Sequence, residues 1–249
     1  MFDEGNGAAL VVIPGVQGRW EWMRPALKSL ARRCRTISYT LSPVTHLDAL
    51  VDQLDGVLDT CGVPAAAVCG VSFGGIVALR YAAARPGRTA ALLLVSAPSP
   101  SWQPSARQKQ YLASPWLSTP AFVASSPLRL WPEIRAAIAS PLERARFAAV
   151  HAGRIAAHPV VPASMASRVA LMAGHDLRAD CARVRAPTLV VTGDDDLDRV
   201  VPAEATREYV NLIPGARYAM MKGTGHIGLV TQPERFAALV ADFLYAERH

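Results

Sequence analysis

The sequence is short of several features that would assign a chain to a particular class. It has no apolar run of 18 or more residues, so no membrane-spanning helix is expected. Charged residues make up only 18% of the chain, which is too few for a disordered protein. Its four cysteines lie far apart and form no Cys-x-x-Cys pair, which argues against a zinc site and a disulfide framework. We interpret them as small core residues or free thiols: Cys34, Cys61, Cys69 and Cys181.

The first residues of the sequence also do not match a secretory signal. Residues 1–5 are acidic where such a signal is basic, and the apolar run Leu10–Ile13 is too short for its hydrophobic segment. We therefore expect a cytoplasmic protein.

The sequence is rich in short apolar runs that alternate with helical patterns. It has 249 residues, of which 51% are hydrophobic, and this suits one large domain with a sizeable core. Strands are predicted over 10–13, 36–41, 66–70, 90–95, 188–192 and 217–221, and helices over 20–33, 46–60, 75–84, 203–212 and 232–246. This alternation predicts an α/β fold whose mostly parallel sheet is covered by helices on both faces.

The alternation is interrupted between the fourth and fifth predicted strands. Helices are predicted there over 132–139, 141–157 and 162–173, with no strand pattern before residue 187. We interpret residues 98–182 as an inserted helical cap, or lid, on a core formed by 1–97 and 183–249. The aromatic and methionine side chains of the insertion are expected mainly to pack the lid, and some to line an apolar acyl pocket: Trp116, Phe122, Trp131, Phe147, Met165 and Met172.

Positive charge is concentrated in the insertion. Residues 103–186 hold eleven Arg or Lys and four Asp or Glu, a net charge of +7, whereas the whole chain carries +6. These residues form no basic run and are not interleaved with aromatics, so nucleic-acid binding is not expected. The segment is either a solvated Arg-rich surface or a face turned toward an anionic substrate or an acidic partner.

A candidate nucleophile follows the third predicted strand. Residues 70–74 read Gly-Val-Ser-Phe-Gly, which matches the Gly-x-Ser-x-Gly nucleophile elbow between a strand and a helix. So tight a turn strains the backbone of Ser72 and leaves almost no room for side chains two residues before and after it. The turn lifts the hydroxyl above the carboxyl ends of the strands, where ligands bind in open α/β sheets. An ordinary serine in a glycine-rich turn is the alternative interpretation.

A serine hydroxyl needs a positioned base, and the sequence offers one late in the chain. His226 ends the segment Gly-Thr-Gly-His, between a predicted strand and the last helix. An acid that orients the histidine should lie in the loop 193–202, which holds four aspartates. We expect the remaining aspartates to be solvated or to cap the helix near residue 203.

Together, Pro14-Gly15, the elbow, the acidic loop and Gly-x-Gly-His resemble the α/β-hydrolase superfamily, specifically its capped serine hydrolases, over residues 8–246. The resemblance implies an oxyanion hole made by the backbone N–H groups of Phe73 and Val16. Its usual acid loop, Gly-x-x-Asp-x-x-Val-Pro, is two residues shorter than the loop here. Counting from Gly193 selects Asp196, and counting back from Val201-Pro202 selects Asp198, which we prefer, with Asp196 as the alternative.

The resemblance also raises a question about the first strands. Members of the superfamily usually begin with a two-stranded hairpin, and only nine residues precede the first apolar run here. Either the hairpin is reduced or the sheet is one or two strands short.

The function implied is hydrolysis of an ester, thioester or lactone, like that of a carboxylesterase, through an acyl-enzyme on Ser72. The substrate would be a small acyl compound, and no metal or organic cofactor is implied. A carbon–carbon bond hydrolase or a cofactor-free acyltransferase would use the same residues. A non-catalytic ligand-binding protein on the same fold is a further alternative.

Overall fold

The structure is a computed structural model that describes residues 1–117, 125–173 and 175–247. It is built on one seven-stranded sheet with the order β1-β3-β2-β4-β5-β6-β7. The strands are β1 (Phe2–Glu4), β2 (Ala9–Ile13), β3 (Arg35–Ser38), β4 (Ala66–Val71), β5 (Thr89–Val95), β6 (Thr188–Thr192) and β7 (Arg217–Met220). Only β1 is antiparallel to its neighbour, so the fold is the mostly parallel α/β sheet that the sequence predicts.

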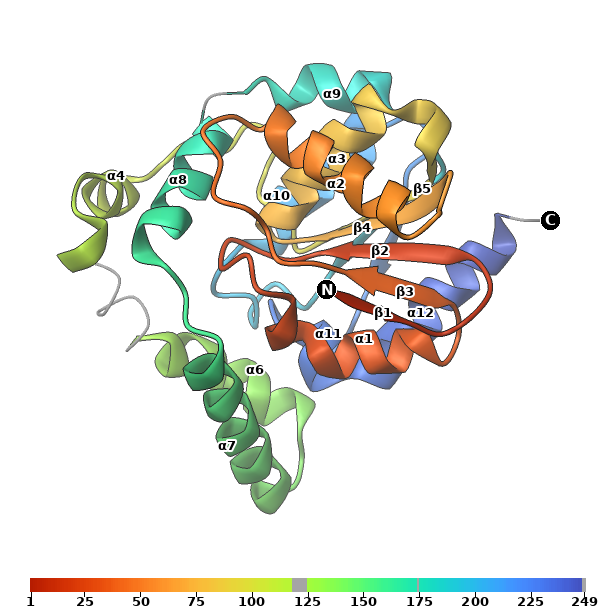
Figure 1. Cartoon of the computed structure of the whole chain (residues 1–249). Helices are drawn as coiled ribbons and strands as arrows, with labels where there is room; N and C mark the ends of the chain where they lie inside the picture. The colour runs from red at the N-terminus through yellow and green to blue at the C-terminus, as the bar shows by residue number, and fades with distance from the viewer. Residues whose placement is uncertain (118–124, 174, 248–249) are drawn as a thin grey trace.

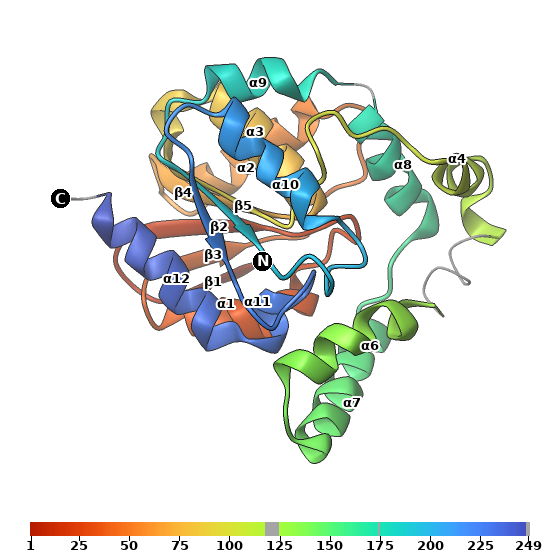
Figure 2. The same ribbon diagram turned by 180° about the vertical axis from the view of Figure 1, so that it is seen from behind.

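Helices cover both faces of the sheet (Figures 1 and 2). One face carries α2 (Asp48–Thr60), α3 (Phe73–Ala84), α9 (Leu177–Arg183) and α10 (Ala203–Leu212), and the other carries α1 (Arg24–Ala31), α11 (Gly228–Thr231) and α12 (Pro233–Ala246). Alternate strand residues divide between two apolar clusters, so that Val68 belongs to one and Cys69 to the other. This two-sided burial explains why the strands read as continuous apolar runs.

The strands and helices expected from periodicity are confirmed, most of them to within a few residues. The expected helix 20–33 is split into the 3-10 turn Trp20–Met23 and α1, where Pro25 lies in the first turn. Short elements of the described residues that have no sequence prediction include β1, α9, α11 and α4 (Ala106–Ala113). They are three to eight residues long, too short for a periodic pattern to stand out.

The question about the first strands is answered by β1. Residues 2–4 form one short strand that pairs antiparallel with β3. In this structure one strand therefore occupies the place of the usual hairpin.

The expected helical insertion lies between β5 and β6. It comprises α4, α6 (Ser126–Ala137), α7 (Pro141–Ala157), α8 (Pro162–Ala173) and α9. Figures 1 and 2 show α6 and α7 protruding beyond the sheet layers, whereas α9 lies over α3. Leu177 and Cys181 of α9 belong to the same apolar cluster as the sheet, so this last part of the insertion packs as core.

The aromatic side chains of the insertion are less buried than its methionines. Trp116 is 66% exposed, whereas Met165 and Met172 are buried. The ring of Phe147 stacks on His151. Phe122 lies outside the described residues.

Three of the four cysteines, Cys34, Cys69 and Cys181, are buried, as expected of small core residues. Among the described residues, no helix is long and apolar enough to cross a membrane.

Candidate active site

The candidate nucleophile stands at the strained turn between β4 and α3. Ser72 has φ 54° and ψ −123°, a conformation that residues other than glycine rarely adopt. A Cβ atom at Gly70 would overlap the backbone of Gly74, and one at Gly74 would overlap the carbonyl oxygen of Ile13. The two glycines are therefore required by space, and strain is stored at the serine between them.

The turn is held by backbone hydrogen bonds on both sides. The Ser72 N–H donates to the Val95 carbonyl at 2.8 Å, and the Gly75 N–H donates to the Ser72 carbonyl at 2.8 Å. Ser72 is half-buried, and Phe73 behind it is only 1% exposed. Helix α3 begins at Phe73, directly after Ser72. Its N-terminus, with the Phe73 N–H, therefore favours negative charge beside the serine hydroxyl.

The loop after β2 lies against this turn. A Cβ atom built on Gly15 would lie 3.4 Å from the Cβ of Ser72, which places the Gly15–Val16 peptide beside the serine. Arg168 of α8 crosses from the insertion and donates to the carbonyl of Val16 at 3.0 Å and to that of Leu41 at 2.8 Å. Burial lowers the pKa of Arg168 to about 10.

The candidate base and acid meet at the neighbouring strand ends. His226 follows β7 and Asp198 follows β6, and the distance from His226 Nδ1 to Asp198 Oδ2 is 3.2 Å. The histidine side chain is 11% exposed and the aspartate side chain 1%. Because β4, β6 and β7 are parallel, Ser72, Asp198 and His226 all lie at the carboxyl edge of the sheet.

Asp198 is held as a carboxylate despite its burial. Burial raises its pKa, but the charge of His226 and hydrogen bonds from His226, Val201 and Val200 outweigh this and hold the pKa below its usual value. Its second oxygen, Oδ1, accepts from the N–H groups of Val200 and Val201 at 3.0 and 2.9 Å. An acid fixed in this way can orient one imidazole tautomer and stabilise the imidazolium.

The other aspartates of the loop have different partners. Asp194 Oδ2 accepts from the Gly223 N–H at 2.6 Å, Asp195 forms an ion pair with Arg207 at 3.1 Å, and Asp196 is exposed. Of the two expectations for these aspartates, exposure to solvent holds for Asp195 and Asp196, whereas none of them caps α10, whose N-cap Pro202 has no side-chain hydrogen bond.

The acid and histidine loops touch backbone to backbone. A Cβ atom at Gly193 would overlap the Thr224 carbonyl, and one at Gly225 would lie against the backbone of Leu197 and Asp198. The Asp194 N–H also donates to the Thr224 carbonyl at 2.8 Å. These close approaches give a physical reason for Gly193 and for Gly225, the residue before the histidine.

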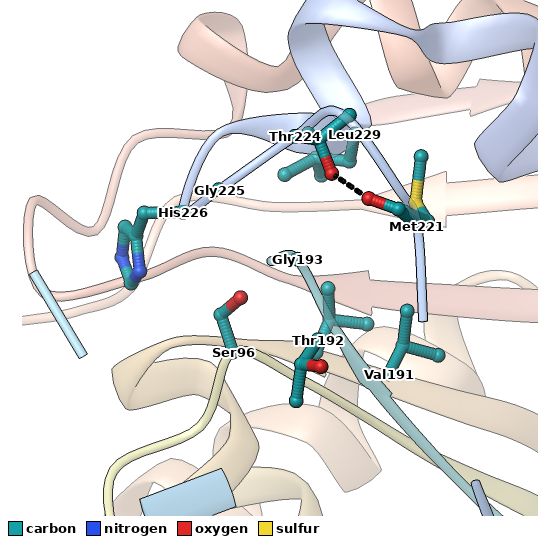
Figure 3. A pocket seen from close by; sticks show the side chains of 11 residues that line it. Ser96, Val191, Thr192, Gly193, Met221, Thr224, Gly225, His226 and Leu229 are labelled. Carbon is teal, nitrogen blue, oxygen red and sulfur yellow. Dashed lines mark hydrogen bonds between the residues drawn. The ribbon is translucent and has the colours of Figure 1, made fainter. Parts of the chain in front are cut away.

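Ser96 is a second strained serine near the site, and sequence reasoning missed it. It follows β5 with φ 44° and is buried. It lines a small pocket together with His226, Thr192, Gly193 and others, as Figure 3 shows. The local sequence does not predict this strain, because a residue other than glycine with positive φ has no characteristic sequence pattern.

Glu133 of α6 is a further buried charge that sequence reasoning missed. Its side chain is fully buried and accepts from the N–H of Ile227, the residue after His226. Glu133 lies 94 residues before Ile227, so no local sequence pattern predicts the contact.

The other described histidines have partners elsewhere. Nδ1 of His46 accepts from the Ala49 N–H, His151 stacks on Phe147, His158 lies beside Arg19 and Glu21, and His175 contacts the Leu171 carbonyl. Within the described residues no group of three or more His, Cys, Asp or Glu side chains is arranged to hold a metal ion.

Comparison with known proteins agrees with the α/β fold described above. The family model described as "Alpha/beta hydrolase family" matches residues 10–239. A hydrolase from Pseudomonas aeruginosa PA01 superimposes with a TM-score of 0.80 at 24% identity, covering 98% of this chain and 92% of that one. At this identity the likeness supports the fold alone.

Two relatives are similar in sequence over most of this chain. A Caulobacter sp. (strain K31) protein named "Putative carbamate hydrolase RutD" is 27% identical over 96% of this chain and 91% of that protein. The polyketide synthase ThaQ of Burkholderia thailandensis is 31% identical over 96% of this chain, but the chain spans only 12% of that protein.

Proposed function

The chain belongs to the alpha/beta hydrolase family, and on that premise we propose that it is a serine hydrolase acting through Ser72, His226 and Asp198. The bond cleaved is an ester, thioester or lactone. The observation that carries the proposal is the 3.2 Å contact of His226 with a buried, ionised Asp198 at the edge of the sheet where Ser72 stands in a strained turn.

In the reaction, Nε2 of His226 removes the proton of the Ser72 hydroxyl, and Oγ attacks the substrate carbonyl carbon. The carbonyl oxygen becomes an oxyanion, held by the N–H groups of Phe73 and Val16. The tetrahedral intermediate collapses, and the leaving group departs with a proton from His226. An acyl-enzyme on Ser72 remains.

Water completes the cycle. His226 takes a proton from the water molecule, whose oxygen attacks the acyl carbonyl carbon and forms a second oxyanion. Breakdown of this intermediate releases the carboxylic acid, and His226 returns the proton to Ser72. Throughout, Asp198 stays ionised and stabilises the imidazolium form of its partner.

The insertion between β5 and β6 is proposed to act as the cap over this site. Arg168 supports that role, since it reaches from α8 to the carbonyl of Val16, whose N–H is the proposed oxyanion donor. Its cationic side chain also lies in the basic segment that could favour an anionic acyl substrate.

The nature of the leaving group is a separate part of the proposal. One relative is named as a putative carbamate hydrolase, so a carbamate, whose carbonyl is flanked by nitrogen, belongs among the compounds to be tested. A panel of p-nitrophenyl esters, acyl thioesters, lactones and aryl carbamates separates these classes by kcat/KM.

The test of the nucleophile is labelling with a fluorophosphonate, which reacts with activated serines. We expect the wild-type protein to be labelled at Ser72 and Ser72→Ala to lose both the label and ester hydrolysis. Ser96→Ala is a matched control, because Ser96 is another strained serine at the same sheet edge and should leave the label in place. Equal labelling of wild type and Ser72→Ala would remove the nucleophile assignment.

A further inference from the structure

A carboxylate from the insertion is buried against the loop that carries His226. Glu133 lies in α6 with 0% exposure. Both of its oxygens accept from the Ile227 N–H, at 3.0 and 3.1 Å, and the backbone of Gly225 also favours the charged form of the carboxylate. The carboxylate therefore holds the backbone immediately after His226.

The charged groups that act on this carboxylate belong to the proposed catalytic pair. They are His226, whose positive charge favours the ionised form of Glu133, and Asp198, whose negative charge disfavours it. The helix α11, which packs against α6, reads Gly-Leu-Val-Thr and carries no titratable side chain. Burial is the largest influence and raises the pKa of Glu133 to about 7.

A buried carboxylate such as that of Glu133 lowers the stability of the fold. A buried carboxylate without a salt-bridged cation costs more than an apolar side chain of similar size, because desolvation outweighs hydrogen bonds to neutral N–H groups. Holding a backbone loop does not by itself require a full charge. The His226 imidazole does benefit from one, because it becomes a cation during the proposed reaction and its charge interacts with that of Glu133.

We infer that Glu133 is a positioning residue of the reaction, which fixes the His226 loop from the cap and stabilises the imidazolium by its charge. The inference rests on the proposed function of His226. If it is correct, the packing of α6 against the core also helps to position His226, because the contact joins the insertion to a core loop.

The test uses the isosteric variant Glu133→Gln, with Glu143→Gln as control. Glu143 is an exposed glutamate of the same insertion. On a p-nitrophenyl ester we expect kcat of Glu133→Gln to fall between about 10-fold and 100-fold, with KM within about threefold, because the base is displaced and its cation loses support. The acid limb of the kcat/KM profile should move to lower pH, since a less stabilised imidazolium needs more acid to form. Glu143→Gln should match the wild type.

Thermal stability separates this role from a merely structural one. The folded-state pKa of Glu133, about 7, is above its ordinary value of 4.5, so the native state binds more protons between these values and loses stability as pH rises through them. The glutamine has no such penalty. Tm of Glu133→Gln minus Tm of the wild type should therefore become more positive from pH 5 to pH 8, while activity at pH 8 is reduced.

Three results would overturn the inference: unchanged kcat, a pH profile that overlays the wild type after scaling, or a Tm difference that does not depend on pH. Failure of the proposed function looks different, because then the wild type itself turns over no ester. In that case NMR titration of the His226 ring still decides, since loss of the Glu133 charge must move its protonation midpoint to lower pH.

Discussion

At the scale of single residues, two buried carboxylates with opposite electrostatic surroundings lie close to one imidazole. Asp198 receives two backbone N–H groups and the histidine, and its pKa is held below the usual value although burial opposes this. Glu133 accepts from the Ile227 N–H but has no ion-pair partner among the described residues, and burial raises its pKa to about 7. The surroundings of the two acids therefore act in opposite directions: they hold the pKa of Asp198 below its usual value and raise that of Glu133 to about 7.

The choice between the two candidate acids leads to a prediction at this scale. Asp198→Asn should lower kcat by a factor on the order of 10⁴, because the amide can no longer hold the correct tautomer or support the imidazolium. Asp196→Asn is the matched control, since Asp196 is an exposed aspartate two residues earlier in the same loop. The measurement is kcat on a short p-nitrophenyl ester. Loss of activity only in the Asp196 variant would reverse the assignment.

At the scale of elements, backbone proximity decides where the site can form. The turn from β4 to α3 brings Gly74 against the carbonyl oxygens of Ile13 and Pro14. The loops after β6 and β7 meet through Gly193 and Gly225. These contacts leave no room for a Cβ, so the spacing of the glycines follows from the geometry of strand ends that converge on one edge.

The prediction at this scale compares two glycines in helices. Gly74→Ala forces a Cβ into the backbone after β2, so we expect a loss of more than about 3 kcal/mol in unfolding free energy and of esterase activity. Gly56→Ala in α2 is the control, because that position is exposed with open space around it. Alanine there should gain about 0.5–1 kcal/mol. Urea unfolding followed by circular dichroism measures both, and a neutral Gly74→Ala would contradict the steric account.

At the scale of the whole molecule, the net positive charge is concentrated in the helical insertion. Residues 103–186, which contain most of the insertion, carry a net +7 within a chain of +6. The rest of the chain carries a net charge of −1. Any long-range steering of an anionic substrate must therefore come from the insertion.

Steering predicts a dependence on salt. Raising ionic strength from about 0.02 M to about 0.5 M should lower kcat/KM several-fold for a mono-p-nitrophenyl adipate, which is anionic, and leave p-nitrophenyl acetate nearly unchanged. The comparison of the two esters at one pH removes effects of salt on the enzyme itself. Equal salt dependence would mean that the Arg-rich face is merely solvated.

The order of elements, the parallel sheet and the identity of the elbow serine could be derived from the sequence. Each depends on residues that are neighbours in the chain: the apolar runs, the helical spacing and the glycines on either side of Ser72. The insertion was recognisable for the same reason, as a long interval without strand patterns. Short elements such as β1 and α11 escaped because three or four residues form no period.

Tertiary structure decided what depends on contacts between distant segments. The sequence favoured Asp198 but kept Asp196 as an alternative, because two anchors in one loop disagreed, and the path of that loop brings Asp198 to His226. Glu133 and Arg168 are unremarkable charges in helices until the fold buries them against Ile227 and Val16, 94 and 152 residues away. Local periodicity encodes which face of an element is buried, but a buried charge acquires its partners only when the whole chain has folded around it.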